Sequence, residues 1–306
     1  MPLCRAFQVL FHLQTAAVVL AYSISADDVI YHEHIIIGGG PAGLQMGYLM
    51  EHFDSETDHD YLIIERSNVS GSWFRKYPRH DRLLSINKVF TGSDHHEFNL
   101  RHDWNSLLTP KKSTGSQFTS NINSDQYDMR FANYSEAYYP DRRDLAQYLA
   151  DFSVFFNLSI AFNTDIVAID QDPSSRLFTI DVDAYTAPYI SDDDQHSDDD
   201  QRAASPQCAA DSDCRTPQRL RYRCKYLFVA TGLSKMNIPP IRGIETATSY
   251  SAMSTDLDRY KNKRIAVLGG GNSAFELAQR VSTVSAYTHI FPVSMPRFSY
   301  ETVCGT

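Results

Sequence analysis

Three glycines, Gly38, Gly40 and Gly43, have the spacing of a turn that binds the pyrophosphate of a dinucleotide. They follow the β-branched run 35–37 and precede an amphipathic stretch, which predicts a buried strand, a tight turn and a helix. The first glycine allows the turn, the second lets the pyrophosphate approach the backbone, and the third lets the helix pack closely on the strand. The phosphate charge would lie at the helix N-terminus. A strand–turn–helix without a ligand is the alternative.

An acidic residue downstream favours the nucleotide interpretation. A second apolar run, 60–64, ends at Glu65, about twenty residues beyond the glycines, where an acid can reach the ribose hydroxyls of an adenosine. The alternative is a surface glutamate. We prefer the nucleotide site because the strand, the glycines, the helix and the acid occur in the order that such a site needs.

A second strand, glycine turn and helix are predicted near the end of the chain. The run 264–268 precedes three glycines, 269–271, and an apolar periodicity follows them. Ala274 replaces the last glycine of the pattern, so a bare strand–turn–helix is again the alternative. Two turns of this kind in one chain predict two nucleotides.

The segments between the turns predict the elements that position them. A helix is expected to begin at 141–145, with an apolar face at Leu145, Tyr148, Leu149, Phe152 and 155–156. Strands are predicted at 158–162, 166–169, 178–182 and 226–232, and the last of them is expected to be buried. Residues 184–219 are rich in aspartate and low in complexity, which predicts a disordered loop within a hairpin-like sheet.

Length and charge narrow the class of protein. The chain has 306 residues, 42% of them hydrophobic, so it can bury one large core or two ordinary ones. Its net charge is −9, and the segment 190–213 alone contributes eight aspartates and one arginine. This balance argues against nucleic acid or an anionic membrane as a partner.

The N-terminus has the features of a secretory signal. Arg5 precedes the apolar run 9–21, and the small residues Ser23, Ser25 and Ala26 suit cleavage. Residues 1–26 are therefore predicted to be removed, leaving a mature chain without a membrane span; an uncleaved amphipathic anchor is the alternative. Cysteines 208, 214, 224 and 304 would remain, and none forms a Cys-x-x-Cys pair, which argues against a redox dithiol. No metal-ligand spacing stands out.

With its two dinucleotide turns, the sequence resembles the flavoprotein oxidoreductases that have two dinucleotide-binding domains, including flavin-containing monooxygenases. The segments 77–80, 85–88, 98–108 and 271–276 are similar to those of a branch of this family in the lumen of the endoplasmic reticulum. The resemblance implies FAD, NADPH, an α/β fold and a link to the degradation of misfolded glycoproteins. Chaperones or misfolded clients would then be partners.

The resemblance also assigns roles to individual residues. The FAD pyrophosphate and ribose would be held by Gly38, Gly40, Pro41, Ala42, Gly43 and Glu65. Trp73 would flank the flavin, and Ala230 and Thr231 would pass beneath it. The pyrophosphate of NAD(P)H would be held by Gly269, Gly271, Asn272, Ser273 and Ala274.

Two further residues complete the predicted site. Asn87 falls where flavin monooxygenases keep an active-site asparagine, whose amide could hydrogen-bond the flavin or the nicotinamide; a loop-capping asparagine is the alternative. Arg297 is the cation nearest the end of the predicted strand 288–291, where the 2′-phosphate of NADP would be read.

The fingerprint that monooxygenases carry before the second turn is degraded. Gly243 remains, whereas Tyr250 and Ser251 stand where His-Ser is expected. We therefore expect an oxidoreductase that passes electrons from NAD(P)H through flavin to an unidentified acceptor. A monooxygenase and a non-catalytic scaffold of the endoplasmic reticulum are the alternatives.

These observations predict an α/β protein of three parts. They are the signal 1–26, a Rossmann-like FAD-binding domain at 27–240, and the start of an inserted Rossmann-like NAD(P)H-binding domain at 241–306. The second glycine turn begins at Gly269 and the given sequence stops at Thr306, which is too little for the remaining strands of such a domain. The expectation is a truncated second domain and a chain that is inactive by itself.

The secretory interpretation predicts a defined mature chain. Because cleavage would follow the small residues, the mature N-terminus should lie between Ile24 and Asp27, and the sequons at Asn133 or Asn157 should carry glycans. N-terminal sequencing and glycosidase treatment of the expressed protein test this. An unglycosylated cytosolic protein that retains Met1 would contradict it.

Overall fold

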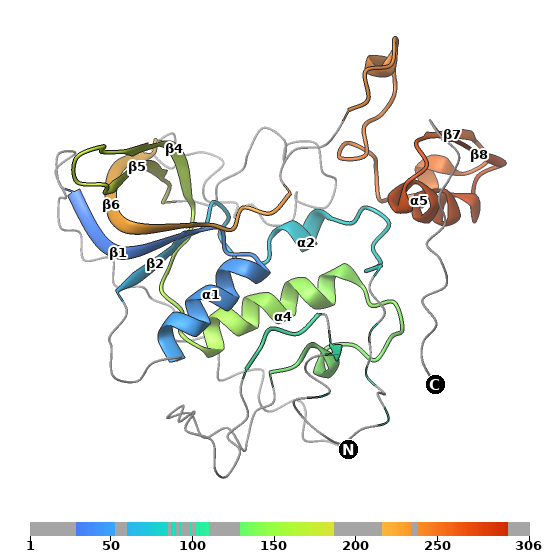
Figure 1. Ribbon diagram of the computed structural model, residues 1–306. Helices are drawn as coiled ribbons and strands as arrows, with labels where there is room; N and C mark the ends of the chain where they lie inside the picture. Colours follow the sequence, from blue (N-terminus) through green and yellow to red (C-terminus); the bar gives the residue numbers. More distant parts are fainter. Residues whose placement is uncertain are drawn as a thin grey trace.

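The structure is a computed structural model. It describes residues 29–52, 60–84, 87, 89, 92, 98, 102, 103, 105–109, 129–186, 216–233 and 238–292. The predicted signal 1–26, most of the acidic segment and Arg297 lie outside these residues, as do Cys208, Cys214 and Cys304. Two sheets are found in the described part, one with six strands and one with two (Figure 1).

The larger sheet combines a parallel half with an antiparallel half. Its strands are β1 (Val29–Ile37), β2 (Tyr61–Ile64), β3 (Ile160–Ala161), β4 (Thr164–Gln171), β5 (Phe178–Ala184) and β6 (Gln218–Val229). They lie in the order β3-β2-β1-β6-β5-β4, in which β3, β2, β1 and β6 are parallel and β6, β5 and β4 are antiparallel neighbours. The carboxyl ends of β1, β2 and β6 therefore meet at one edge, where α/β proteins bind their ligands.

Two helices cover one face of the parallel strands (Figure 1). They are α1 (Pro41–His52) and α4 (Arg142–Phe155), and α4 begins where the side chain of Asp141 accepts a hydrogen bond from the N–H of Arg143, 2.8 Å away. Shorter helical elements are α2 (Trp73–Lys76), η1 (Phe131–Asn133), η5 (Ile244–Thr246) and η6 (Leu257–Tyr260).

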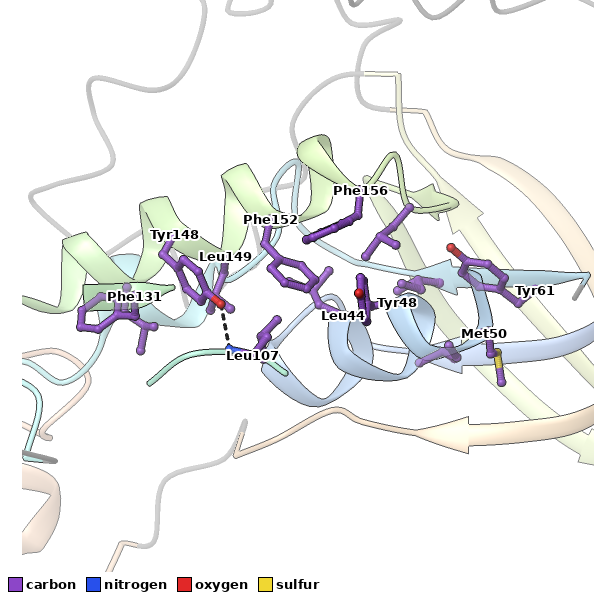
Figure 2. Packing of buried hydrophobic residues seen from close by; sticks show 14 of the residues in the cluster. Leu44, Tyr48, Met50, Tyr61, Leu107, Phe131, Tyr148, Leu149, Phe152 and Phe156 are labelled. Atoms are coloured by element: carbon purple, nitrogen blue, oxygen red, sulfur yellow. Dashed lines mark hydrogen bonds between the residues drawn. The ribbon is translucent and has the colours of Figure 1, made fainter. Parts of the chain in front are cut away.

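Aromatic side chains of α4 and α1 form the main core (Figure 2). The rings of Tyr48 and Phe156 meet edge to face at 4.6 Å, and Phe152 lies between the helices with no exposed surface. The N–H of Leu107 donates to the Tyr148 hydroxyl at 2.7 Å, so a buried phenol is satisfied by a backbone group. The predicted apolar face of the 141–156 helix is thus confirmed, except that Phe155 remains 39% exposed because it points away from that face.

A second core lies on the other face of the sheet. Side chains alternate along a strand, so Ile36 and Ile63 join the helical core while Ile35 and Leu62 pack with β5 and β6. Cys224 is fully buried there, and burial raises the pKa of its thiol to about 11. The described residues thus place this thiol in a core, where it is unsuited to redox chemistry.

The smaller sheet forms the second strand–turn–helix unit. The strands β7 (Arg264–Leu268) and β8 (Tyr287–Phe291) are parallel, and α5 (Asn272–Ser282) connects them. Ala278 and Val281 are the buried residues of α5. This βαβ unit confirms the predicted strands at 264–268 and 288–291.

The structure corrects two expectations about β6. The strand begins at Gln218, inside the segment predicted to be a loop, because its first half pairs with β5 in the register Ala184↔Gln218. The strand is also less buried than predicted, with Val229 69% exposed. Pairing with β5 ends at Cys224, so the last residues of β6 pair only with β1 within the described part of the chain.

The aromatic core predicts a sharp contrast between neighbouring positions of α4. Phe152→Ala should lower the free energy of unfolding by about 3–5 kcal/mol, because it leaves a cavity between the two helices. Val154→Ala, on the solvent side of the same helix and 65% exposed in the native protein, should change it by less than about 0.5 kcal/mol. Urea unfolding followed by circular dichroism measures both, and equal losses would contradict this packing.

Candidate functional site

The first glycine turn is formed by close backbone contacts. Gly38 has a φ of +107°, and a β-carbon there would lie 2.6 Å from the carbonyl oxygen of Ala230. The N–H of Ala230 donates to Ile37 O at 2.9 Å, which joins the end of β6 to the end of β1. A β-carbon on Gly43 would lie 1.8 Å from Gly38 O, so only glycine fits at this position in the first turn of α1.

Gly40 differs from the other two glycines because it faces open space. A β-carbon there would meet no atom within 4 Å. The first bond of the helix runs from the N–H of Leu44 to Gly40 O at 2.9 Å, which leaves the N–H groups of Ala42 and Gly43 without an acceptor in the helix. Pro41 occupies the first helical position, where its missing N–H costs nothing. This opening beside free donors fits the pyrophosphate of a dinucleotide.

Glu65 lies at this turn, as the sequence predicts for a ribose-binding acid. One carboxylate oxygen, Oε2, accepts a hydrogen bond from the N–H of Gly39 at 2.6 Å, and Oε1 accepts one from the N–H of Ser67 at 2.8 Å. The residue is 9% exposed. The acid thus supports the turn itself and places a negative charge beside the start of α1.

Trp73 is brought to the same edge by a backbone contact. The N–H of Gly71 donates to Gly39 O at 3.0 Å, and α2 follows directly. The Trp73 ring is 40% exposed and lies 5.2 Å from the ring of Tyr77. Ala230 and Thr231 follow β6 at this edge, so the predicted flavin-side residues come from neighbouring segments.

Asn87 is buried, and two of its groups are held by one backbone segment. Its N–H donates to Tyr138 O at 2.9 Å and its amide nitrogen donates to Ser135 O at 2.5 Å. The amide oxygen is buried without a hydrogen-bond partner among the described residues. The two hydrogen bonds fit an asparagine that anchors a loop. The amide oxygen is the atom that a ligand could engage.

The second glycine turn reproduces part of the first. Gly269 has a φ of +138°, and its N–H donates to Phe291 O at 3.0 Å, which ties β7 to β8. A β-carbon on Gly271 would meet nothing within 4 Å, and Gly271 caps α5 without a side-chain hydrogen bond. The predicted residues Asn272, Ser273 and Ala274 form the first turn of that helix.

A tyrosine joins the second turn to the first half of the chain. The Tyr250 hydroxyl accepts a hydrogen bond from the N–H of Arg79 at 2.8 Å, lies 3.3 Å from Nδ1 of His80, and is hydrogen-bonded to the side chain of Ser273. Burial raises the pKa of Tyr250, and burial lowers the pKa of His80. Both groups are therefore neutral at pH 7. The Tyr250 ring also stacks on the ring of Tyr77, with 6.2 Å between the ring centroids.

Sequence reasoning missed the residues of this contact. In the sequence, the run 77–80 carries only a family resemblance, and Tyr250 only departs from a fingerprint. The loop 79–81 is held by Arg142 of α4 and Arg280 of α5, for which no local pattern exists. Arg297, the predicted reader of the 2′-phosphate, lies outside the described residues.

The described residues contain neither a metal-binding cluster nor a membrane-spanning helix. No group of three or more histidine, cysteine, aspartate or glutamate side chains could hold a metal ion within this part of the chain. Among the same residues, no helix has the length and apolar character needed to cross a bilayer.

Comparisons with known proteins agree with this geometry. Residues 35–191 and 214–293 match the family described as pyridine nucleotide-disulphide oxidoreductase. The chain is similar to FAD-dependent oxidoreductase domain-containing protein 2 of Mus musculus, with 33% identity over 287 residues. The match covers 93% of this chain and 36% of the mouse protein, so the chain spans about a third of that relative's length.

Solved structures show the same fold. A flavin-containing monooxygenase from Stenotrophomonas maltophilia superimposes with a TM-score of 0.55 at 17% identity, over 90% of this chain and 62% of its own. A complex of OTEMO with FAD and NADP gives 0.50 at 16% identity, over 86% and 39%. The predicted α/β class, with a Rossmann-like arrangement at the first turn, is confirmed.

Gly40, directly before α1, and Gly43, within it, should respond differently to the same substitution. Gly43→Ala should destabilise the ligand-free protein by about 2 kcal/mol or more, because the new methyl group overlaps Gly38 O. Gly40→Ala should leave its free energy of unfolding within about 1 kcal/mol, because the site is open. Denaturant unfolding without nucleotide measures both; tolerance of Gly43→Ala would show that the turn is looser than described.

Proposed function

The chain belongs to the pyridine nucleotide-disulphide oxidoreductase family, and we propose that it forms the FAD-binding part of an NAD(P)H-dependent oxidoreductase. The observation that carries this proposal is the open position at Gly40 beside the free N–H groups of α1, with Glu65 at the end of β2. A dinucleotide needs an approachable backbone, free donors for its phosphates and an acid for its ribose, and these residues supply all three.

The described residues would bind and orient the cofactor, whose own chemistry is two-electron redox transfer. Gly40, Ala42 and Gly43 would present backbone to the pyrophosphate, and the start of α1 would stabilise its charge. Both carboxylate oxygens of Glu65 already accept a backbone N–H, from Gly39 and Ser67. To bind a ribose hydroxyl, one oxygen would either give up that hydrogen bond or accept a second one. Trp73 would shield one side of the flavin from water, and the backbone after β6 would lie beneath it.

The second turn supports a second nucleotide, which we propose is NADPH. Gly271 is open like Gly40, and it precedes the first turn of α5 in the same way. The OTEMO structure, which shares the fold, is a complex with FAD and NADP. Arg297 remains our proposed contact for the 2′-phosphate, because it follows β8, the second strand of this unit.

The identity of the electron acceptor separates two catalytic candidates. A disulphide acceptor held by this part of the chain has no support, because Cys224 is the described cysteine and its thiol is buried in the second core. A monooxygenase is supported by the buried amide oxygen of Asn87 and by the shared fold of the Stenotrophomonas maltophilia enzyme. A non-catalytic scaffold that keeps the fold is the third candidate.

The proposed compartment of the protein is the lumen of the endoplasmic reticulum. The apolar N-terminus and the sequons support the lumen of the endoplasmic reticulum, and the resemblance to a lumenal branch of the family supports a role in the degradation of misfolded glycoproteins. Chaperones or misfolded clients would then be the protein partners.

Paired glycine variants of the full-length protein test the two nucleotide sites. Gly40→Val should abolish flavin binding, because its side chain would occupy the space of the pyrophosphate. The matched variant Gly271→Val should keep its flavin and lose reduction by NADPH. Glu65→Ala should weaken FAD by about 1–3 kcal/mol. Absorption spectra before and after anaerobic addition of NADPH measure all three.

Two outcomes would contradict the proposal. A wild-type protein that stays colourless in excess FAD would overturn the first site. A flavin-bound wild type that NADPH does not reduce, and NADH does not reduce either, would favour the scaffold. Oxygen uptake stimulated by a substrate would favour the monooxygenase over other acceptors.

A further inference from the structure

Asp81 is shared by arginines from two different parts of the protein. Its Oδ1 accepts a hydrogen bond from Nε of Arg142 at 2.9 Å, and its Oδ2 lies 2.6 Å from Nη1 of Arg280. A third guanidinium, that of Arg143, lies 3.7 Å from Oδ1. The carboxylate is only 10% exposed, so these cations rather than water provide most of its solvation. Asp81 itself has a φ of +67°, a conformation that non-glycine residues adopt rarely.

Arg142 fixes Asp81 within the first half of the chain. Its side chain is fully buried at the start of α4 and also donates to the carbonyl oxygens of Phe74, at 3.0 Å, and Arg75. Its N–H donates to the carbonyl oxygen of Asp81 at 2.8 Å. This arginine therefore joins α4, the end of α2 and the loop that carries Asp81.

Arg280 approaches the same loop from the second unit. It lies in the last turn of α5, and its guanidinium donates to His80 O at 3.2 Å and to Thr255 O at 3.1 Å in addition to its contact with Asp81. In turn, the guanidinium of Arg79, in the loop, donates a hydrogen bond to Met253 O, which precedes the second unit. The loop 79–81 is thus held by polar contacts from both sides.

These contacts matter because α5 begins at the second glycine turn. A helix is stiff along its length, so a contact that fixes its last turn also fixes where its first turn points. We propose that Asp81, acting through Arg280, is a positioning residue that holds α5 so that a nucleotide at Gly271 faces the flavin side of the protein. This inference rests on the proposed function, because it assumes that both turns bind nucleotides.

A purely structural role for Asp81 is the competing explanation. Neutralising Asp81 would remove the carboxylate that pairs with the buried Arg142 and would destabilise the whole protein. Arg280 separates the two explanations, since its removal leaves the Arg142–Asp81 pair of the first half intact. The informative variant is therefore Arg280→Gln, with Arg280→Lys as the conservative change and Arg264→Gln, an exposed arginine of β7, as the matched control.

Hydrogen exchange and reduction kinetics of the full-length, FAD-loaded protein test the proposal together. In Arg280→Gln, the exchange protection of the α5 amides, 272–282, should fall by about tenfold or more, because a partly buried, charged hydrogen-bond donor is lost. The protection of α1 and the flavin content should stay at the wild-type level. The rate of flavin reduction at saturating NADPH should fall by about tenfold, with a change of less than about threefold in NADPH affinity. Arg280→Lys should recover part of both losses, and Arg264→Gln should cause neither.

Three results would overturn the proposal. The first is wild-type exchange in α5 and wild-type reduction in Arg280→Gln. The second is an equal loss of protection in α1 and α5, which would show a general effect on stability. The third is the same change in Arg264→Gln, which would show an effect of charge alone. If NADPH does not reduce the wild type, the proposed function and the positioning of a nucleotide both fail; the exchange data would still decide whether Arg280 anchors α5.

Discussion

The close approach of three backbone segments at the first glycine turn is the constraint on which the larger sheet depends. The end of β1, the start of α1 and the end of β6 meet where β-carbons on Gly38 or Gly43 would overlap carbonyl oxygens. This contact sets the crossover from β1 through α1 to β2, and it places Glu65 against the N–H of Gly39. It leaves room at Gly40 alone within this turn, so the geometry that closes the turn also opens the position proposed for the pyrophosphate.

The two cores keep that turn in place from opposite faces of the sheet. Aromatic side chains of α1 and α4 bury one face of β1 and β2, and the antiparallel strands β5 and β6 bury the other. Because both faces of β1 are covered, its last residues form a continuous apolar run, Ile35 to Ile37. The proposed site therefore lies on a rigid edge, and the orientation of its N–H donors is decided by packing far from the turn.

The second unit is attached by a different kind of interaction. Its contacts with the loop 79–81 are hydrogen bonds and ion pairs, centred on Asp81 and the Tyr250 hydroxyl. Polar contacts of this kind are directional, so they specify an orientation more sharply than an apolar surface does. The proposed pair of nucleotides would need such an orientation, because the two would have to meet at a fixed distance.

The sequence by itself determined the local parts of this protein. The glycine turns, the helix at Arg142–Phe155, the strand at Phe178–Ala184 and the place of Glu65 all follow from periodicity and spacing within short windows. Their physical causes are local: the left-handed backbone of Gly38, the apolar stripe of a helix and the alternation of a strand. The start of β6 was misplaced because it depends on a partner strand, β5, from across the acidic segment.

Only the tertiary structure decided which distant residues share a charge or a hydrogen bond. His80 and Arg280 are 200 positions apart, and no pattern in either segment announces their contact. From the sequence alone, Arg280 is indistinguishable from an ordinary solvated cation. In the folded protein it contacts the buried carboxylate of Asp81, which is also paired with Arg142. The free energy of that contact depends on burial and on the alignment of three groups from three elements, which sequence spacing does not encode.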